Sequence, residues 1–376
     1  MIPKEPLPST DSSHETFVLN IGPQHPATHG VLRVKVKMEG EYVLRAEPVV
    51  GYIHRMQEKM GENRTYNQFL PNTSRMDYLS ALIYSHAFVG AVERGLKLQV
   101  PPRAEYIRVI TSELNRISSH LVWWGAFLLD LGGFTPMLYA FDDREKILDL
   151  LEAITGSRLT YSYFRIGGLC NDVDDEFVSG ARAFVKHMRP RLKMYRALVT
   201  DNIILRKRLE GIGPIDAEMC RKYGATGQVI RAAGVPYDVR RAEPYSVYPE
   251  MDFVVPTCKE GDSMSRYIVH MEELAQSLRI IEQGLDKLPS GPVMAEKVPR
   301  VIKLPAGDYC HAVEAARGRF LVRITSDGKD FPYRVKLRTP CLSNLSLFEE
   351  ASRGMLLADA LALMGSLDLV IPDIDR

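Results

Sequence analysis

Apolar and polar residues alternate near both ends of the chain, a pattern that predicts short strands. From residue 31 to 38 every second side chain is apolar and the side chains between them are mostly basic. This is the period of a half-buried strand. Glu39-Gly40 then offers a turn into 42–45, the second arm of a hairpin. Around Asp327-Gly328 the same reasoning predicts another hairpin, with arms at 319–325 and 333–338.

Between these ends, apolar residues recur every three or four positions, as in amphipathic helices. The longest stripe starts at Pro101-Pro102, which suit a first helical turn, and stops at Gly132-Gly133. Another starts after the acidic residues 174–176 and is predicted to run, kinked at Pro190, to the basic residues 206–208. A third stripe covers 268–285. The pattern therefore predicts a mostly helical core.

These elements predict an α+β, mostly α fold with small terminal β-hairpins. We expect four regions, all packed as one domain. They are a polar tail at 1–16, a hairpin region at 17–50, a helical core at 51–300, and a C-terminal hairpin and helix at 301–376.

Charge and hydropathy exclude several classes of protein. The 48 basic and 47 acidic residues nearly cancel, so no basic field is available to bind nucleic acid. The most apolar window, 121–129, ends at Asp130 and is shorter than the roughly 20 residues of a membrane span. The polar start of the chain lacks a signal-peptide pattern. If the protein works at a membrane, a partner must hold it there.

The five cysteines are widely scattered, and no two have a C-x-x-C spacing. This argues against a disulfide framework, a zinc knuckle or an iron–sulfur cluster ligated by this chain. We therefore expect no metal and no cofactor bound by the chain itself.

Two histidines, His25 and His29, lie in the segment Gly-Pro-Gln-His-Pro-Ala-Thr-His-Gly at 22–30. Their spacing suits a metal only if a helix places them on one face. Pro26 between them and Gly30 after them disfavour a helix. From the pattern alone, a rigid turn with exposed histidines is favoured over any functional role.

Asp130 and Tyr78 are polar residues in unusual places. Asp130 follows nine apolar residues near a helix C-terminus, where the dipole disfavours negative charge. It is either exposed or paired, and histidine is a natural partner for it. Tyr78 lies at the start of a predicted helix through Leu82, Phe88 and Val92. If buried, it usually bonds a backbone carbonyl, and less often a ligand.

Six segments spread over nearly the whole chain resemble the D subunit (49-kDa type), which is the quinone-site subunit of proton-pumping NADH:quinone oxidoreductase (respiratory complex I). They are GPQHPATHGVLR at 22–33, GYIHRMQEK at 51–59, RTYNQFLPNTSRMDYLS at 64–80, PPRAEYIRV at 101–109, SDGKDFPYRVKLR at 326–338 and SLDLVIPDIDR at 366–376.

The resemblance implies roles for the polar residues at the quinone headgroup. His29 and Tyr78 would hold the two quinone carbonyls and donate a proton to each oxygen. Asp130 would pair with His29, and His25 would shape the same turn and contribute to quinone binding, with a smaller part in the chemistry. Arg55 and Arg75 would lie beside a [4Fe-4S] cluster bound by a neighbouring subunit, where positive charge raises the cluster's potential. Ordinary ion pairs are the alternative for these two arginines.

One position departs from the family pattern. Many members carry a histidine near the cluster where this chain has Thr160. Because threonine does not titrate near neutral pH, we expect the cluster's potential to depend less on pH here.

The resemblance also implies kinship with the large subunit of nickel–iron hydrogenases, and hence a fold like that helical core. Those enzymes hold their metals with two C-x-x-C pairs. Here Asp77 and Ser80 take the first pair's places, and Val370 and Asp373 take the second's. Soft-metal ligation is therefore lost, and the old metal cavity would be the quinone pocket.

The expected function is quinone reduction coupled to proton translocation, on the cytoplasmic face of the bacterial inner membrane. The expected partners are three other members of complex I: the cluster-bearing B subunit, the C subunit and the membrane-embedded H subunit. Two alternatives stay open: a scaffold protein without chemistry, and a related complex whose electron donor is ferredoxin or a deazaflavin.

Overall fold

The computed structural model describes residues 16–25 and 30–376, of which about half are helical. The strands are β1 (Thr16–Ile21), β2 (Arg33–Glu39), β3 (Tyr42–Val49), β4 (Phe164–Arg165), β5 (Gly168–Leu169), β6 (Gly307–Ala315), β7 (Gly318–Ser326) and β8 (Arg334–Arg338). The longer helices are α3 (Ala81–Leu96), α4 (Pro102–Asp130), α5 (Phe134–Thr155), α6 (Asp175–Tyr195), α11 (Ser263–Asp286) and α14 (Leu357–Ser366). The α+β, mostly α fold class is confirmed.

Shorter helical segments connect these elements. They are α1 (Gln57–Glu62), α2 (Tyr66–Thr73), α7 (Ile203–Leu209), α8 (Ala217–Tyr223), α9 (Gln228–Ala232), α10 (Val239–Ala242), α12 (Pro340–Leu345), α13 (Phe348–Ala351) and α15 (Ile371–Ile374), with a π-helical turn η2 (Arg196–Thr200) and a 3₁₀ turn η3 (Tyr248–Glu250).

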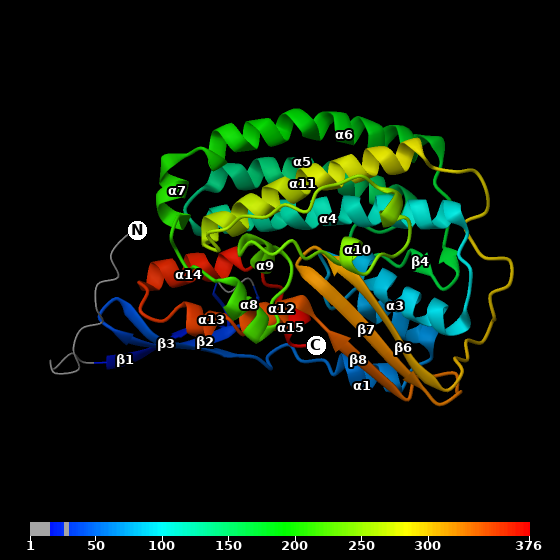
Figure 1. Cartoon of the computed structure of the whole chain (residues 1–376), viewed down its shortest axis with the longest axis horizontal. Helices are drawn as coiled ribbons and strands as arrows, with labels where there is room; N and C mark the ends of the chain where they lie inside the picture. The colour runs from blue at the N-terminus through cyan, green and yellow to red at the C-terminus, as the bar shows by residue number, and fades with distance from the viewer. Residues whose placement is uncertain (1–15, 26–29) are drawn as a thin grey trace.

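Helices α4, α5, α6 and α11 pack side by side as a bundle along one side of the molecule (Figure 1). Trp124 of α4 lies at its centre. The Trp124 ring packs on Tyr195 of α6 with 4.3 Å between ring centroids, and its Nε1 donates to the Tyr267 hydroxyl of α11 at 3.0 Å. The helix predicted from Pro101-Pro102 to Gly132-Gly133 is confirmed as α4.

Helix α6 starts where predicted, with the Asp174 side chain accepting from the Phe177 amide at 2.8 Å. It continues through Pro190 to Tyr195. The prediction of one helix reaching 206–208 is wrong, since η2 intervenes. Asn202 then caps α7 by accepting from the Ile204 amide at 2.8 Å.

The two ends of the chain meet in one layer. The predicted hairpin β2–β3 is confirmed, and β1 adds a third antiparallel strand that the sequence pattern did not predict. The edge strand β3 pairs with the C-terminal region, where the Val43 amide donates to the Met355 carbonyl at 2.8 Å. The inner face of this sheet shares one apolar cluster with α14 and α15.

The second sheet, β6–β7–β8, covers α3. Its β7–β8 hairpin is the one predicted around Asp327-Gly328, and β6 is an additional strand. Gly90 allows α3 to approach β6 closely, because a methyl group there would lie 2.3 Å from the His311 ring.

Within the described part of the chain, no helix is both long enough and apolar enough to cross a bilayer.

Candidate functional site at the Tyr78 loop

Tyr78 lies in the short connection between α2 and α3, three residues before the first residue of α3. Its side chain is 38% exposed. The neighbouring Asp77 is fully buried, and its Oδ1 accepts from the backbone amides of Leu79 at 3.1 Å and Ser80 at 3.2 Å. Asp77 therefore holds the connection in a defined turn that presents Tyr78 at the surface of this chain.

His29 lies outside the described residues, but the two ends of its turn are placed. His25 and Gly30 pair as an antiparallel bridge, which returns the chain on itself as the sequence predicted. Gly30 packs on α15, because a Cβ at this position would lie 2.7 Å from Cγ1 of Ile371.

The Tyr78 connection reaches the same place. Leu79 packs against the apolar cluster that contains Leu32 and Ile371. The structure thus places the immediate neighbours of Tyr78 and of the His29 turn on one cluster. The convergence of the two side chains themselves stays a prediction.

Asp130 is the last residue of α4 and is exposed. The end of this helix is held against α14, since Trp123 Nε1 donates to the Gly365 carbonyl at 2.9 Å and the Phe127 ring packs on Gly365. Asp130 is thus exposed at a helix end that is held in place, and its pairing with His29 stays a prediction.

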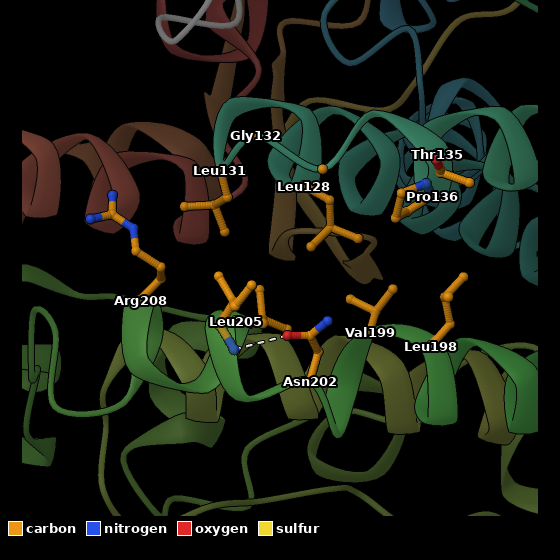
Figure 2. Close-up of a pocket in the computed structure, with 12 residues that line it drawn as sticks. Leu128, Leu131, Gly132, Thr135, Pro136, Leu198, Val199, Asn202, Leu205 and Arg208 are labelled. Atoms are coloured by element: carbon orange, nitrogen blue, oxygen red, sulfur yellow. Dashed lines mark hydrogen bonds between the residues drawn. The ribbon is translucent and has the colours of Figure 1, made fainter.

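A cavity of about 280 Å³ opens beside the end of α4 (Figure 2). It separates the α4–α5 connection from η2 and α7, and leucine and valine side chains face each other across it. Leu128 and Leu131, on either side of Asp130 in the sequence, belong to its lining, whereas Tyr78 does not. This apolar cavity is therefore separate from the Tyr78 loop.

Arg55 and Arg75 lie together. Arg55 Nη2 donates to the Arg75 carbonyl at 2.7 Å, and Arg75 Nη1 donates to the Pro71 carbonyl at 2.6 Å and to Ser74 Oγ at 2.8 Å. Among the described residues, no carboxylate forms an ion pair with either arginine. Two positive charges thus lie together, an exposed Arg55 and a partly buried Arg75 three residues before Tyr78, an arrangement suited to an anionic neighbour.

Thr160 lies in the connection from α5 to β4 and is partly buried. Its φ of 50° is uncommon for a β-branched residue. The structure therefore holds residue 160 in a specific backbone conformation.

The four positions expected to replace metal-binding cysteines, Asp77, Ser80, Val370 and Asp373, are all buried. Asp373 Oδ1 accepts from the Tyr84 hydroxyl at 2.6 Å, and its Oδ2 accepts from the Cys341 amide at 3.1 Å. Burial, and then the nearby charge of Asp77, raise the pKa of Asp373 to about 6. The two segments therefore lie close to each other, joined by the Tyr84–Asp373 hydrogen bond.

Behind the Tyr78 loop lies a network of buried charges that the sequence analysis missed. Arg317 pairs with Asp77 at 2.9 Å and with Asp368 at 3.0 Å. Asp368 Oδ2 lies 3.4 Å from Nε2 of His270.

The network continues into the helical bundle. His120 Nε2 lies 3.1 Å from Glu273 Oε2, and Glu273 pairs with Arg231. Ionisable residues at helical spacing within the buried helix α4, at 113, 116 and 120, were the signal that could have revealed it.

The side chains of His120, His270 and Asp368 bring ligand-type atoms within 4.8 Å of one another. However, Asp368 already pairs with Arg317, and Glu273 beside His120 pairs with Arg231. Because these guanidinium groups already supply the positive charge, we assign the three residues to the ion-pair network rather than to a metal centre.

Comparison with known proteins identifies the family. The profile of the respiratory-chain NADH dehydrogenase 49 kDa subunit matches residues 130–376. The chain belongs to this family. The prediction made from the six segments is confirmed. The similarity also extends to the residues before 130, because alignment with one relative covers 96% of this chain.

Several of these relatives are named as the D subunit of NADH-quinone oxidoreductase. One from Opitutus terrae, named as a second D subunit, is 74% identical over 363 residues, which cover 96% of this chain and 91% of the relative. One from Desulfotalea psychrophila is 67% identical and covers 96% of this chain and 97% of its own. A more distant one from Geobacillus kaustophilus is 47% identical, with 96% and 98% covered.

Proposed function

We propose that this chain forms the quinone-headgroup site of a respiratory NADH:quinone oxidoreductase complex. Membership of the 49 kDa family and relatives named as the D subunit of NADH-quinone oxidoreductase support the assignment to such a complex. The observation that carries the finer proposal is that Leu79, next to Tyr78, and Gly30, next to His29, both pack on the apolar cluster that contains Ile371.

In this proposal, the quinone headgroup lies between Tyr78 and His29. A quinone has two opposed carbonyl oxygens, and two-electron reduction places a proton on each. A phenol and an imidazole can each hold a carbonyl and then donate. Asp130 pairs with His29 and stabilises its protonated form, and His25 shapes the turn that carries His29.

The electrons come from a [4Fe-4S] cluster in the neighbouring B subunit, and this chain holds neither metal nor cofactor. Arg55 and Arg75 face that cluster, whose negative charge they offset. With Thr160 in place of the frequent histidine, the pH dependence of the cluster's potential is weaker. The C and H subunits complete the surroundings and hold the chain at the cytoplasmic face of the membrane, where quinone reduction is coupled to proton translocation.

Replacement of Tyr78 by phenylalanine tests the proposal. Tyr78→Phe removes one oxygen from a partly exposed side chain, so the complex assembles normally. Loss of a proton donor lowers quinone reductase activity by roughly 100-fold or more. The exposed Tyr333 provides a matched control, because Tyr333→Phe makes the same chemical change on the β7–β8 hairpin, where no role is proposed.

The assay is NADH:quinone reductase activity of the purified complex, normalised to its content of this chain. Full activity in assembled Tyr78→Phe would favour a scaffold role and refute the proposal. The electron donor is tested separately, by offering NADH, reduced ferredoxin and a reduced deazaflavin to the same preparation.

A further inference from the structure

Arg317 is the buried residue that connects the Tyr78 loop with the ion-pair network. It lies in the turn between β6 and β7 and is only 1% exposed. Its Nη1 donates to Asp77 Oδ2 at 2.9 Å and to Ser119 Oγ at 3.0 Å, while its Nη2 lies 3.0 Å from Asp368 Oδ1. One guanidinium therefore bridges two carboxylates from distant parts of the chain.

The backbone around Arg317 is held tightly. A Cβ at Gly227 would lie 2.3 Å from the Arg317 carbonyl oxygen, and one at Gly318 would lie 2.6 Å from the Gly227 amide nitrogen. Both glycines also have positive φ, +71° and +127°. Such close packing fixes the position of the turn, and with it the position of the guanidinium beside Asp77.

Asp77 transmits this contact to Tyr78. One carboxylate oxygen accepts from Arg317, while the other accepts from the amides of Leu79 and Ser80. These are the two residues directly after Tyr78. A shift of Asp77 would therefore change the turn on which the Tyr78 side chain stands.

Arg317 also sets the charge near Tyr78. Burial raises the pKa of the Tyr78 phenol, and the Arg317 guanidinium opposes that rise, whereas Asp77 adds to it. Although burial alone lowers an arginine's pKa, Asp368 and Asp77 raise the pKa of Arg317, so it stays charged.

The other titratable groups that face Arg317 are Cys341 and Tyr84. Burial, followed by the charge of Asp373, raises the pKa of both well above their ordinary values. Both are therefore neutral near pH 7. On the far side of Asp368, His270 is fixed by Nδ1 at 2.8 Å from the Arg266 carbonyl and by its stacking on Trp123. Arg317 is thus a buried cation that both contacts the Asp77 turn and acts by its charge on the Tyr78 phenol.

We propose that Arg317 is the positioning residue for proton donation by Tyr78, fixing the Asp77 turn and offsetting the negative charge left on the phenol oxygen. This inference rests on the proposed function. In the step, the Tyr78 O–H bond breaks and a new O–H bond forms on the quinone oxygen, which has received electrons from the partner's cluster. A proton from water then restores the phenol.

The test uses Arg317→Lys and Arg317→Gln in the assembled complex. Lysine keeps the charge but loses the two-pronged contact, whereas glutamine loses both. We expect Arg317→Gln to lower kcat roughly tenfold with KM for quinone little changed, since a charge-assisted contact is lost. Without the guanidinium the pKa of Tyr78 rises, so the alkaline limb of the pH–kcat profile moves to higher pH. In Arg317→Lys, kcat and the position of the alkaline limb should lie between those of Arg317→Gln and of the unmodified protein.

Arg231 supplies a matched control. It is another fully buried arginine between carboxylates, Glu273 and Glu314, and it does not contact Asp77. We expect Arg231→Lys to leave the pH profile of the assembled complex unchanged. If Arg317→Lys and Arg231→Lys change activity and pH profile alike, the special role of Arg317 is wrong.

A double-mutant cycle separates this inference from the proposed function. In a Tyr78→Phe background, Arg317→Lys should have no further effect on kcat, because no phenol remains to be assisted. If Arg317→Lys lowers kcat in the Tyr78→Phe background as much as it does in the unmodified complex, this inference is wrong, while the proposed function stands. No effect of Tyr78→Phe itself overturns the proposed function. Should Arg317→Gln fail to assemble, the lysine variant and its cycle decide the question.

Discussion

His120 and His311 are held neutral inside the protein. Burial lowers the pKa of His120 from its ordinary 6.5 to about 4, even though Glu273 beside it favours the charged form. Burial, together with the charges of Arg94 and Arg108, lowers the pKa of His311 to about 3. In the unfolded chain both rings take up a proton near pH 6.5, whereas in the folded protein they do so only at much lower pH.

Folding stability should therefore fall as the pH falls from about 6.5 to 4. Over this range the unfolded state binds more protons than the folded state. Each pH unit therefore lowers the free energy of unfolding by about 1.4 kcal/mol per histidine. For His120 the shift corresponds to about 3 kcal/mol at pH 4. His120→Gln keeps a donor for Glu273 and cannot titrate.

The measurement is chemical denaturation of the full chain at several pH values between 4 and 7. We expect a shallower loss of unfolding free energy for His120→Gln than for the unmodified chain. Parallel curves for the two proteins would show that His120 titrates normally in the fold.

Local sequence patterns were enough to single out Tyr78, Asp130 and the His25–Gly30 turn as individual features. Each of them lies next to a helix end or a strand that the pattern predicts. Arg317 and Asp368 could not be found this way. They are isolated in sequence, and their significance comes only from the folding of distant segments onto Asp77.

At the scale of elements, the contact between α3 and β6 supports the Tyr78 connection. Tyr78 lies three residues before α3, and Gly90 in the middle of this helix lies against the His311 ring of β6. A side chain larger than hydrogen would push the helix away from the sheet. The position of α3, and with it that of Tyr78, therefore depends on this glycine.

Gly90→Ala should destabilise the chain. Overpacking typically costs about 1–3 kcal/mol, which exceeds the gain of about 1 kcal/mol from helix propensity. The matched control is Gly180→Ala in α6, whose added methyl meets only the end of the Leu150 side chain at 2.7 Å. Denaturation of the full chain should show a loss of unfolding free energy for Gly90→Ala only. Equal stability of the two variants would contradict the packing argument.

Periodicity predicted the β2–β3 and β7–β8 hairpins, in which burial largely alternates. It also predicted α4, because its apolar residues recur at helical spacing although most of its residues are buried. It missed β6, because residues 311–315 are buried on both faces and include Glu314, so no alternation remains. Periodicity also missed the break after α6. The apolar pattern continues past this break, whereas the new helix α7 is marked only by the single capping residue Asn202.

At the scale of the whole molecule, the ends of the chain meet. The N-terminal sheet packs on α14 and α15 (Figure 1), and Gly30, which follows His29 in the sequence, lies against Ile371 of α15. Sequence reasoning predicted terminal β elements but not their packing on each other, because contacts between segments at opposite ends of the chain leave no local pattern.

The proposed function requires that one quinone ring lies between Tyr78 and His29. An experimental structure of the assembled complex with quinone bound tests it most directly. We predict one quinone oxygen within about 3.2 Å of the Tyr78 hydroxyl and the other within the same distance of a His29 ring nitrogen. A headgroup bound elsewhere, or the two side chains too far apart to contact one ring, would contradict the account.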